Sequence, residues 1–276
     1  LTSITQVEIA TVDVGMNDLR GQTVLLTGAS GGLGPYMAAR LRAEGASLIL
    51  TGRDEDALRQ VATSVGADRI VVADLSRREE VASLPEQAGH IDILVASAAV
   101  PAMGELADFT VEQIDRAVDV NLRSAIVLAN RLLPSMLSRR SGHIVLLASM
   151  HGKIPAALVS VYNATKFGLR GFGLALAQEL KGTGVGVSVI NPTFVSSAGM
   201  WAETGTTTHP LAGQATPEQV AEAVIRGIRE NRVEIDVAPL GARLAAASPH
   251  LVGAVARRLG ATTVPAAAVD HHLARR

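Results

Sequence analysis

The chain of 276 residues contains no cysteine. This absence excludes disulfides, a thiolate nucleophile and every zinc or iron–sulfur site with cysteine ligands. A chain without disulfides fits the reducing cytoplasm, which is the location we predict. The segment Leu1–Asp18 carries acidic residues and no basic flank before an apolar stretch, so it is not typical of a signal peptide. No apolar run is long enough to span a bilayer, and we predict no membrane span.

A charge imbalance is lacking as well, since the formal net charge is -1. This balance gives no reason to expect nucleic acid or an acidic membrane as the main partner. The sequence also lacks internal repeats and any linker rich in proline, glycine and serine. Hydrophobic residues make up 48% of the chain, enough to fill a sizeable core. We therefore predict one folded domain.

Short apolar, β-branched segments alternate with longer segments of helical pattern, such as 33–44 and 112–137. The continuous hydrophobicity of the short segments is typical of strands covered on both faces. The pattern predicts an α/β protein with a single-domain, doubly wound Rossmann-type fold and a seven-stranded, mostly parallel sheet. The predicted strands are Thr23–Thr27, Ser47–Thr51, Arg69–Ala73, Ile91–Val95, His143–Ala148, Val185–Ile190 and Val233–Val237.

The predicted boundaries are an N-terminal extension over residues 1–18, a dinucleotide-binding catalytic domain over 19–239, and a partly mobile, helical C-terminal tail over 240–276. Within the tail, Pro249–Leu259 can form an amphipathic helix that packs on its own domain or on a neighbouring subunit. A membrane-surface function through Arg257 and Arg258 is the alternative. His271 and His272 have no third ligand at a useful spacing, and we predict no metal site.

Three glycines, Gly28, Gly32 and Gly34, follow the first predicted strand in a turn that opens the next helical pattern. In that position, backbone N–H groups and a helix N-terminus can hold a pyrophosphate. The spacing differs from G-x-G-x-x-G, so an ordinary tight turn is the alternative. At the end of the second predicted strand the first charged residue is Arg53, which favours a ribose 2′-phosphate and hence NADP(H). Pairing of Arg53 with a neighbouring acid is the alternative, which leaves NAD(H) open.

Tyr162 and Lys166 are four residues apart, which places them on one face of a helix. An ammonium beside a phenol favours the ionised phenol, and so lowers a pKa that is about 10 in the free side chain. The pair is predicted to act as a proton switch in a hydride-transfer enzyme. A buried tyrosine that merely satisfies its hydroxyl is the alternative.

These motifs occur in one order with Asp74-Leu75 after the third predicted strand, Asn121 in Val120-Asn121-Leu122, and Ser149 after the fifth. In this combination the chain resembles the short-chain dehydrogenase/reductase family over about residues 19–239. The resemblance implies that Tyr162 is the general acid in carbonyl reduction and the base in alcohol oxidation. It implies that Ser149 hydrogen-bonds the substrate oxygen, that Lys166 lowers the tyrosine pKa and binds the nicotinamide ribose, and that Asn121 positions a water that connects the lysine to solvent.

Each of these residues also has a structural alternative. Ser149 can cap a strand end, Asn121 can bond backbone groups within a helix, and Asp74 can cap a helix that begins near Ser76 instead of contacting the adenine. Val195 and Ser197 align with positions that hold the carboxamide in the family. The full set of cofactor contacts that the resemblance implies is Gly28, Ser30, Gly32, Leu33, Gly34, Arg53, Asp74, Leu75, Tyr162, Lys166, Val195 and Ser197.

Two segments depart from the family pattern. Where the family often has Asn-Asn-Ala-Gly, this chain has Ala96-Ser97-Ala98-Ala99, so asparagine hydrogen bonds that brace the central strands are missing or are replaced by Ser97 and backbone groups. The family's Pro-Gly after the sixth strand is Pro192-Thr193 here, without the freedom of glycine at positive φ. Both departures concern the fit of the cofactor and leave the acid–base residues in place.

The sequence thus predicts an NADP(H)-dependent oxidoreductase that transfers a hydride between nicotinamide and a carbonyl or secondary alcohol. Candidate walls of the substrate pocket are Met150, Leu158, Met200 and Trp201, which favour an apolar small molecule; an interface or a lid over the cofactor is the alternative. His151 is expected to shape this pocket, with a function as a second acid or base as the alternative. Alternatives are an NAD-dependent alcohol dehydrogenase, an isomerase or lyase, and a non-catalytic nucleotide-binding regulator. The resemblance further implies a homotetramer or homodimer with contacts through 112–137 and 160–180.

Overall fold

A single parallel sheet of seven strands forms the centre of the protein, in the order β3-β2-β1-β4-β5-β6-β7. The computed structural model describes residues 18–202 and 213–247. Every strand pair is parallel, so the predicted fold is confirmed and "mostly parallel" understates it. The strands are β1 (Thr23–Thr27), β2 (Ser47–Gly52), β3 (Arg69–Val72), β4 (Ile93–Ala96), β5 (Gly142–Leu147), β6 (Val185–Pro192) and β7 (Glu234–Val237).

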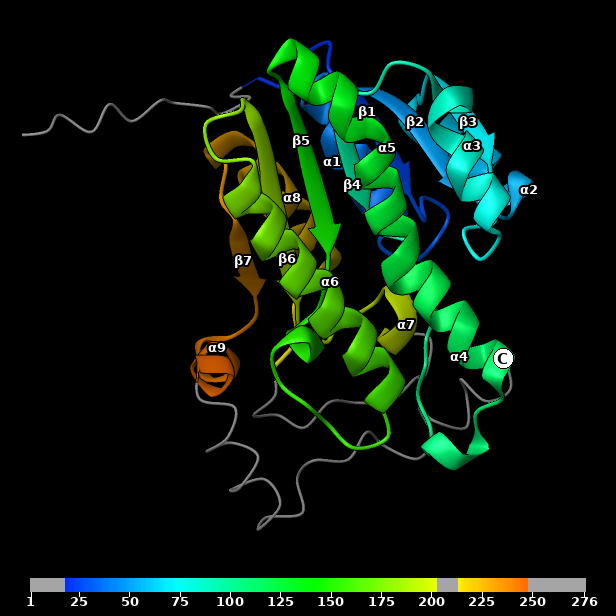
Figure 1. The fold of residues 1–276 in the computed structure, drawn as a ribbon, viewed down its shortest axis with the longest axis vertical. Coiled ribbons are helices and arrows are strands. Elements are labelled where there is room, and N and C mark those ends of the chain that lie inside the picture. The colour runs from blue at the N-terminus through cyan, green and yellow to red at the C-terminus, as the bar shows by residue number, and fades with distance from the viewer. Residues whose placement is uncertain (1–17, 203–212, 248–276) are drawn as a thin grey trace, which may run out of the picture.

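Helices cover both faces of this sheet (Figure 1). Buried side chains of α3, α5 and α6 belong to the core on one face, and those of α1, α2 and α8 belong to the core on the other. In Figure 1, α5 and α6 lie in front of the sheet, and α1 and α8 lie behind it. The helices are α1 (Gly34–Ala43), α2 (Glu55–Val65), α3 (Arg78–Ala88), α4 (Val111–Val118), α5 (Ser124–Arg139), α6 (Ser160–Glu179), α7 (Gly199–Ala202), α8 (Pro217–Glu230) and α9 (Leu240–Ala247).

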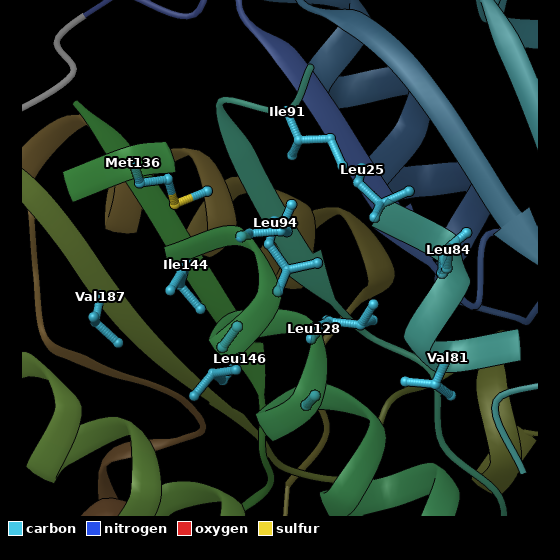
Figure 2. Packing of buried hydrophobic residues seen from close by; sticks show 14 of the residues in the cluster. Leu25, Val81, Leu84, Ile91, Leu94, Leu128, Met136, Ile144, Leu146 and Val187 are labelled. Carbon is cyan, nitrogen blue, oxygen red and sulfur yellow. The ribbon is translucent and has the colours of Figure 1, made fainter. Parts of the chain in front are cut away.

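Successive residues of the central strands enter the two cores alternately. Leu25 of β1 packs in the core beneath α3, α5 and α6, whereas its neighbours Val24 and Leu26 pack in the core beneath α1 and α8. Figure 2 shows the first of these cores, where Leu25 and Leu94 of the sheet face the helix residues Leu84 and Leu128. Because side chains alternate across a strand, a strand buried on both faces needs an apolar residue at every position. This requirement accounts for the uninterrupted apolar segments of the sequence.

The predicted helix over 112–137 is wrong as a single α-helix. The structure has α4, then a π-helical turn over Asp119–Arg123, and then α5. A π-helical turn adds one residue to a helix and is frequent at functional sites, but it leaves the helical hydrophobic pattern almost unchanged. Asn121 lies in this turn and is buried. The sequence therefore predicted the path of the chain and missed the local change of pitch.

Several predicted features lie outside the described residues. They are most of the N-terminal extension, the segment Pro249–Leu259, and the pair His271 and His272. Of the predicted tail, the structure describes α9. Within residues 18–202 and 213–247, no helix combines the length and the apolar character needed to cross a bilayer.

His143, at the start of β5, makes the stability of this fold depend on pH. Its Nε2 lies 2.9 Å from Ser188 Oγ, and the Ser188 hydroxyl donates to the carbonyl oxygen of Arg232 at 2.7 Å. Burial lowers the pKa of His143 to about 3. The unfolded chain takes up this proton near pH 6.5, so the contribution is complete above that pH and is lost as pH falls toward 3. The contribution of His143 alone should make the free energy of unfolding, measured by urea denaturation, about 2 kcal/mol lower at pH 5 than at pH 7.

The variant His143→Gln should lose most of this contribution to the pH dependence. His90→Gln is the matched control, because the His90 side chain is 64% exposed. The same pH dependence in His143→Gln and in the unaltered protein would contradict a buried neutral imidazole.

Candidate active site

Two adjoining cavities lie at the carboxyl ends of the strands, where α/β sheets bind ligands. The larger has a volume of about 410 Å³ and is lined by the glycine-rich turn together with Arg53, Asp74 and Leu75. The smaller has a volume of about 120 Å³ and is lined by Ser149, Tyr162 and Lys166 among others. The two share five wall residues, so they form one continuous cleft. The shared residues are Leu33, Ser97, Ala99, Gly199 and Met200.

The glycines of the turn are required by close backbone approaches. Gly28 has φ +68°, and a Cβ there would lie 2.8 Å from Ala98 Cα. A Cβ at Gly32 would lie 2.1 Å from the backbone nitrogen of Gly199. The helix α1 begins directly after this turn, at Gly34, and has no acidic residue in its first turn. A cradle of bare backbone at a helix N-terminus fits a pyrophosphate, because N–H groups and the helix dipole both face the anion.

Gly32→Ala tests this cradle. The added methyl group would meet backbone atoms of Gly199, which cannot rotate away, so the turn and the 198–200 segment must separate. We expect NADPH binding to weaken about 10- to 100-fold, as measured by quenching of intrinsic fluorescence. Gly31→Ala is the matched control, because a Cβ at Gly31 meets only Gly28 O at 3.2 Å. Equal affinities in the two variants would contradict the steric requirement at Gly32.

Arg53 follows β2 and lines the larger cavity. Two of its acidic neighbours are engaged elsewhere, since the Asp54 carboxylate caps α2 by accepting from Ala57 N at 2.9 Å and Glu55 pairs with Arg59. Among the described residues Arg53 forms no ion pair with Asp54, Glu55 or Asp56, so its guanidinium is available for an anionic ligand.

Asp74 also lines the larger cavity, and its carboxylate accepts from the backbone N–H and the hydroxyl of Ser76 at 2.9 and 2.8 Å. It thus closes the turn before α3 and does not cap the helix itself, which has Arg77 at its N-cap. Burial raises the pKa of the Asp74 carboxyl, but the bonds from Ser76 and the positive charges of Arg53 and Arg116 outweigh burial and lower it. Arg116, on α4, is a cavity residue that the sequence pattern did not single out.

Ser149, Tyr162 and Lys166 come together in the smaller cavity. Ser149 lies between β5 and the 3₁₀ turn Met150–Gly152, and its hydroxyl accepts from His151 N at 3.1 Å and donates to Pro192 O at 3.4 Å. Tyr162 and Lys166 lie one helical turn apart on α6. The Lys166 Nζ donates to the carbonyl oxygen of Leu147 at 2.7 Å and lies over the Tyr162 ring, 5.7 Å from its centroid. The arrangement joins a hydroxyl, a phenol and an ammonium at the inner end of the cleft.

The electrostatics of this group differ from the prediction that Lys166 lowers the tyrosine pKa. Burial raises the pKa of Tyr162 to about 12, against the opposing hydrogen bond from Ser149. Burial likewise lowers the pKa of Lys166 to about 8. Both shifts have the same cause, because burial disfavours whichever form is charged. The phenol is consequently protonated at neutral pH, which is the form that can donate to a carbonyl oxygen.

Asn121 does not line either cavity. Its amide nitrogen donates to Val100 O at 2.9 Å and its amide oxygen accepts from Val100 N at 2.7 Å. The same nitrogen lies 3.4 Å from Thr165 Oγ1 of α6. Asn121 therefore fastens a wall of the larger cavity to the helix that carries Tyr162 and Lys166, which corresponds to the structural alternative.

Of the two predicted cofactor contacts after β6, Val195 and Ser197, only Val195 lines a cavity. Val195 lines the smaller cavity, whereas Ser197 is exposed, has φ +60°, and donates its hydroxyl to Ser196 O at 2.6 Å. Ser197 is not among the described residues that line either cavity, so the predicted contact through its hydroxyl is not supported.

The predicted walls of the substrate pocket are only partly correct. Met200 lines both cavities, but Met150 and Leu158 line neither, and the side chain of Trp201 lies outside the described part. Met103 and Phe194 line the smaller cavity instead. Met103 reaches this cavity only through folding, and no local pattern in the sequence marks it.

His151 lines the smaller cavity, as expected for a residue that shapes the pocket. Its ring centroid lies 6.0 Å from that of Tyr162, with the two rings edge to face. Burial lowers the pKa of His151 to about 4, so the imidazole is neutral at neutral pH.

Both departures from the family pattern are accommodated. Thr27 Oγ1 accepts from the backbone N–H groups of Ser97 and Ala98 at 3.0 and 3.1 Å, so a threonine of β1, rather than the Ser97 side chain, braces the central strands. After β6, Thr193 needs no positive φ and donates its N–H to Val237 O at 3.0 Å. The sequence alone gave no reason to connect Thr27 with this function.

An ionic cluster near Ser149 also escaped the sequence patterns. Lys153 Nζ lies 2.7 Å from Asp236 Oδ1 and 3.0 Å from Glu234 Oε1, and Asn191 donates to both carboxylates. Lys153 follows the 3₁₀ turn, while the acids lie on β7. The cluster ties the segment next to Ser149 to the edge of the sheet. Among the described residues, no group of three or more histidine, aspartate or glutamate side chains could hold a metal ion.

The fold and the cleft define a Rossmann-type protein with a dinucleotide-shaped site. The family model described as short chain dehydrogenase matches residues 22–209. Ketoacyl reductase HetN of Nostoc sp. is 40% identical over 230 residues, which cover 80% of this chain and 80% of that protein. The chain belongs to the short-chain dehydrogenase/reductase family and is an oxidoreductase.

Solved structures agree with this assignment. A metagenomic short-chain oxidoreductase in complex with NADP superposes with a TM-score of 0.68 at 29% identity, over 80% of this chain and 98% of that chain. The 3-ketoacyl-(acyl-carrier-protein) reductase of Brucella melitensis, complexed with NADH, superposes with a TM-score of 0.70 at 27% identity, over 80% and 98%. Nicotinamide dinucleotides of both kinds thus occur in proteins similar to this one.

Proposed function

We propose that the protein is an NADP(H)-dependent reductase of an apolar ketone, with the reverse oxidation of the secondary alcohol open to the same site. The observation that supports this most directly is the gathering of Ser149, Tyr162 and Lys166 in a small cavity that opens into the glycine-lined cleft. An acid, a hydroxyl donor and a buried cation at the inner end of a dinucleotide-shaped cleft suit hydride chemistry at a carbonyl.

The residues would divide the reaction as follows. When bound in the cleft, a nicotinamide dinucleotide would supply the hydride for the carbonyl carbon. Tyr162 gives its phenolic proton to the carbonyl oxygen, and the new O–H bond completes the alcohol. The Ser149 hydroxyl donates to the same oxygen and stabilises the charge that develops there. Lys166 then stabilises the phenolate that Tyr162 becomes, because its ammonium lies over the ring.

The apolar walls of the smaller cavity support the proposed class of substrate. Met103, Phe194, Val195 and Met200 line it, and its one charged side chain among the described residues is Lys166, which is bonded to Leu147 O. A substrate carboxylate would find no free cation there. Because relatives are named ketoacyl reductases, a 3-ketoacyl thioester belongs in the test panel beside simple apolar ketones, with a 2-keto acid as the charged comparison.

Arg53→Asp tests the preference for NADP(H). The change removes a cation that can bind a 2′-phosphate and adds an acid that can bond a ribose 2′-hydroxyl. We expect the affinity for NADPH to fall about 100-fold and that for NADH to be maintained or to rise, as followed by nicotinamide emission. Arg59→Asp is the matched control, since Arg59 is paired with Glu55 on the surface of α2. An unchanged ratio of the two affinities in Arg53→Asp would rule out this selection.

We also infer a homotetramer or homodimer and a cytoplasmic location. The assembly is what the resemblance to the family implies. Leu137 of α5, 37% exposed, and Phe167 of α6, 40% exposed, are single apolar side chains that a contact through these helices would cover.

A further inference from the structure

Three charged side chains line the larger cavity among the described residues: Arg53, Asp74 and Arg116. The lowered pKa of Asp74 means that its carboxylate is ionised at neutral pH. Arg53 and Asp74 alone sum to zero charge. With Arg116 the wall carries one net positive charge, which suits an anionic ligand better than Arg53 alone would.

Arg116 is held at this wall by its position on α4. It lies in the last turn of the helix, four residues before Val120, which lines the same cavity. The helix has a fixed beginning, because Thr110 and Gln113 form a capping box there. Arg116 and Val120 therefore share one helix face, and that face is turned to the cleft.

Within residues 18–202 and 213–247, the guanidinium of Arg116 has no partner of its own. It is half-buried and makes neither a hydrogen bond nor an ion pair within the described residues. Two other arginines near α4 behave differently, because Arg78 and Arg123 both pair with Asp119 at 3.5 and 3.8 Å. The positive charge of Arg116 does act on Asp74, together with that of Arg53. A half-buried cation without a partner costs desolvation free energy unless an anionic ligand pairs with it.

We propose that Arg116 is a second specificity-determining residue, which together with Arg53 binds the 2′-phosphate of the dinucleotide. The inference rests on the proposed NADP(H)-dependent function and deepens it. A phosphate monoester carries close to two negative charges at neutral pH, and the Asp74 carboxylate on the same wall would repel it. Two guanidinium groups from separate elements, the β2 end and α4, supply the forked donors and the charge that such a group requires.

Two fragments without nicotinamide isolate the phosphate from the rest of the dinucleotide. Isothermal titration of the full chain with 2′,5′-ADP and with 5′-AMP measures the contribution of the 2′-phosphate as a ratio of affinities. Arg116→Ala should weaken 2′,5′-ADP about 10- to 100-fold and leave 5′-AMP within about twofold. Arg78→Ala removes the same charge from a side chain outside the cavity, and it should leave both affinities unchanged. Arg116→Lys keeps the charge without the fork and should give an intermediate loss.

Each other result overturns the inference. An equal loss of affinity for both fragments in Arg116→Ala would mean that Arg116 attracts anions in general and does not select the 2′-phosphate. No loss of affinity for either fragment would mean that Arg116 does not contact the ligand. If circular dichroism shows that Arg116→Ala does not fold, the ratio of the two fragment affinities in Arg116→Lys decides in the same way. If the unaltered protein binds NADPH and the variants keep its ratio of affinities for 2′,5′-ADP and 5′-AMP, this inference fails but the proposed function stands. Wild-type protein that binds neither fragment nor either dinucleotide defeats the proposed function as well.

Discussion

Tyr162→Phe should lower kcat/KM for carbonyl reduction about 1000-fold while NADPH still binds. The substitution removes one oxygen, and with it the proton that the phenol would donate to the carbonyl. Because burial raises the pKa of Tyr162 to about 12, this proton is present throughout the neutral range. The aromatic ring stays, and so does its packing with Met103, Val159 and Val161. The expected result is therefore a loss of turnover without a comparable loss of stability or of cofactor binding.

The chain offers one matched control, since Tyr36 is its other tyrosine. Tyr36 lies on α1 and is exposed, so Tyr36→Phe should keep full activity. Steady-state turnover of NADPH with a responsive ketone, together with a fluorescence titration of NADPH, separates chemistry from binding. Activity within tenfold of the unaltered enzyme in Tyr162→Phe would exclude the phenol as the acid.

Lys166→Met should lower kcat/KM by at least about 100-fold and yet leave the fold intact. The ammonium is buried, and its pKa of about 8 means that holding the charge in the fold is unfavourable by about 3 kcal/mol at pH 7. Methionine removes that penalty but leaves Leu147 O without this donor, at a cost of about 1–3 kcal/mol. The two nearly cancel, so the free energy of unfolding should change by less than about 2 kcal/mol.

The same lysine predicts the basic limb of the pH profile. Above about pH 8 the folded protein loses the Lys166 proton, and the cation over the phenol disappears. The kcat/KM of reduction should therefore fall above that pH. In the unfolded chain the lysine keeps its proton up to about pH 10.5, so the folded state gains stability between pH 8 and pH 10.5 while activity is lost. A profile that stays flat through pH 9.5 would contradict the assigned function of Lys166, and so would a large destabilisation of Lys166→Met.

The sequence predicted the sheet well because its strands are buried on both faces. Continuous apolar segments such as Val24–Leu26 indicate buried strands when regular helical segments lie between them. Helix spacing likewise placed Tyr162 and Lys166 on one face of a helix. Ser149 entered the predicted site only through the resemblance to the short-chain dehydrogenase/reductase family, because no local pattern connects it with the other two residues.

The remaining features depend on contacts between distant parts of the chain. The bracing bonds of Thr27 to Ser97 and Ala98 span about 70 residues, and Arg116 joins Arg53 at one wall only when α4 packs beside the sheet ends. The sign of the tyrosine pKa shift was wrong for the same reason. Spacing places Lys166 one turn from Tyr162, but it does not reveal how deeply both are buried, and burial decides the shift.

The central claim is hydride transfer from NADPH to an apolar carbonyl at the Tyr162 site. The measurement that tests it most directly mixes purified protein and NADPH with the panel of 3-ketoacyl thioesters and apolar ketones, and follows the absorbance of the reduced nicotinamide while the alcohol is quantified. We predict NADPH consumption matched one to one by alcohol, faster than with NADH and abolished in Tyr162→Phe. NADPH that binds tightly but is consumed with no member of the panel, or consumed equally by Tyr162→Phe, would contradict it.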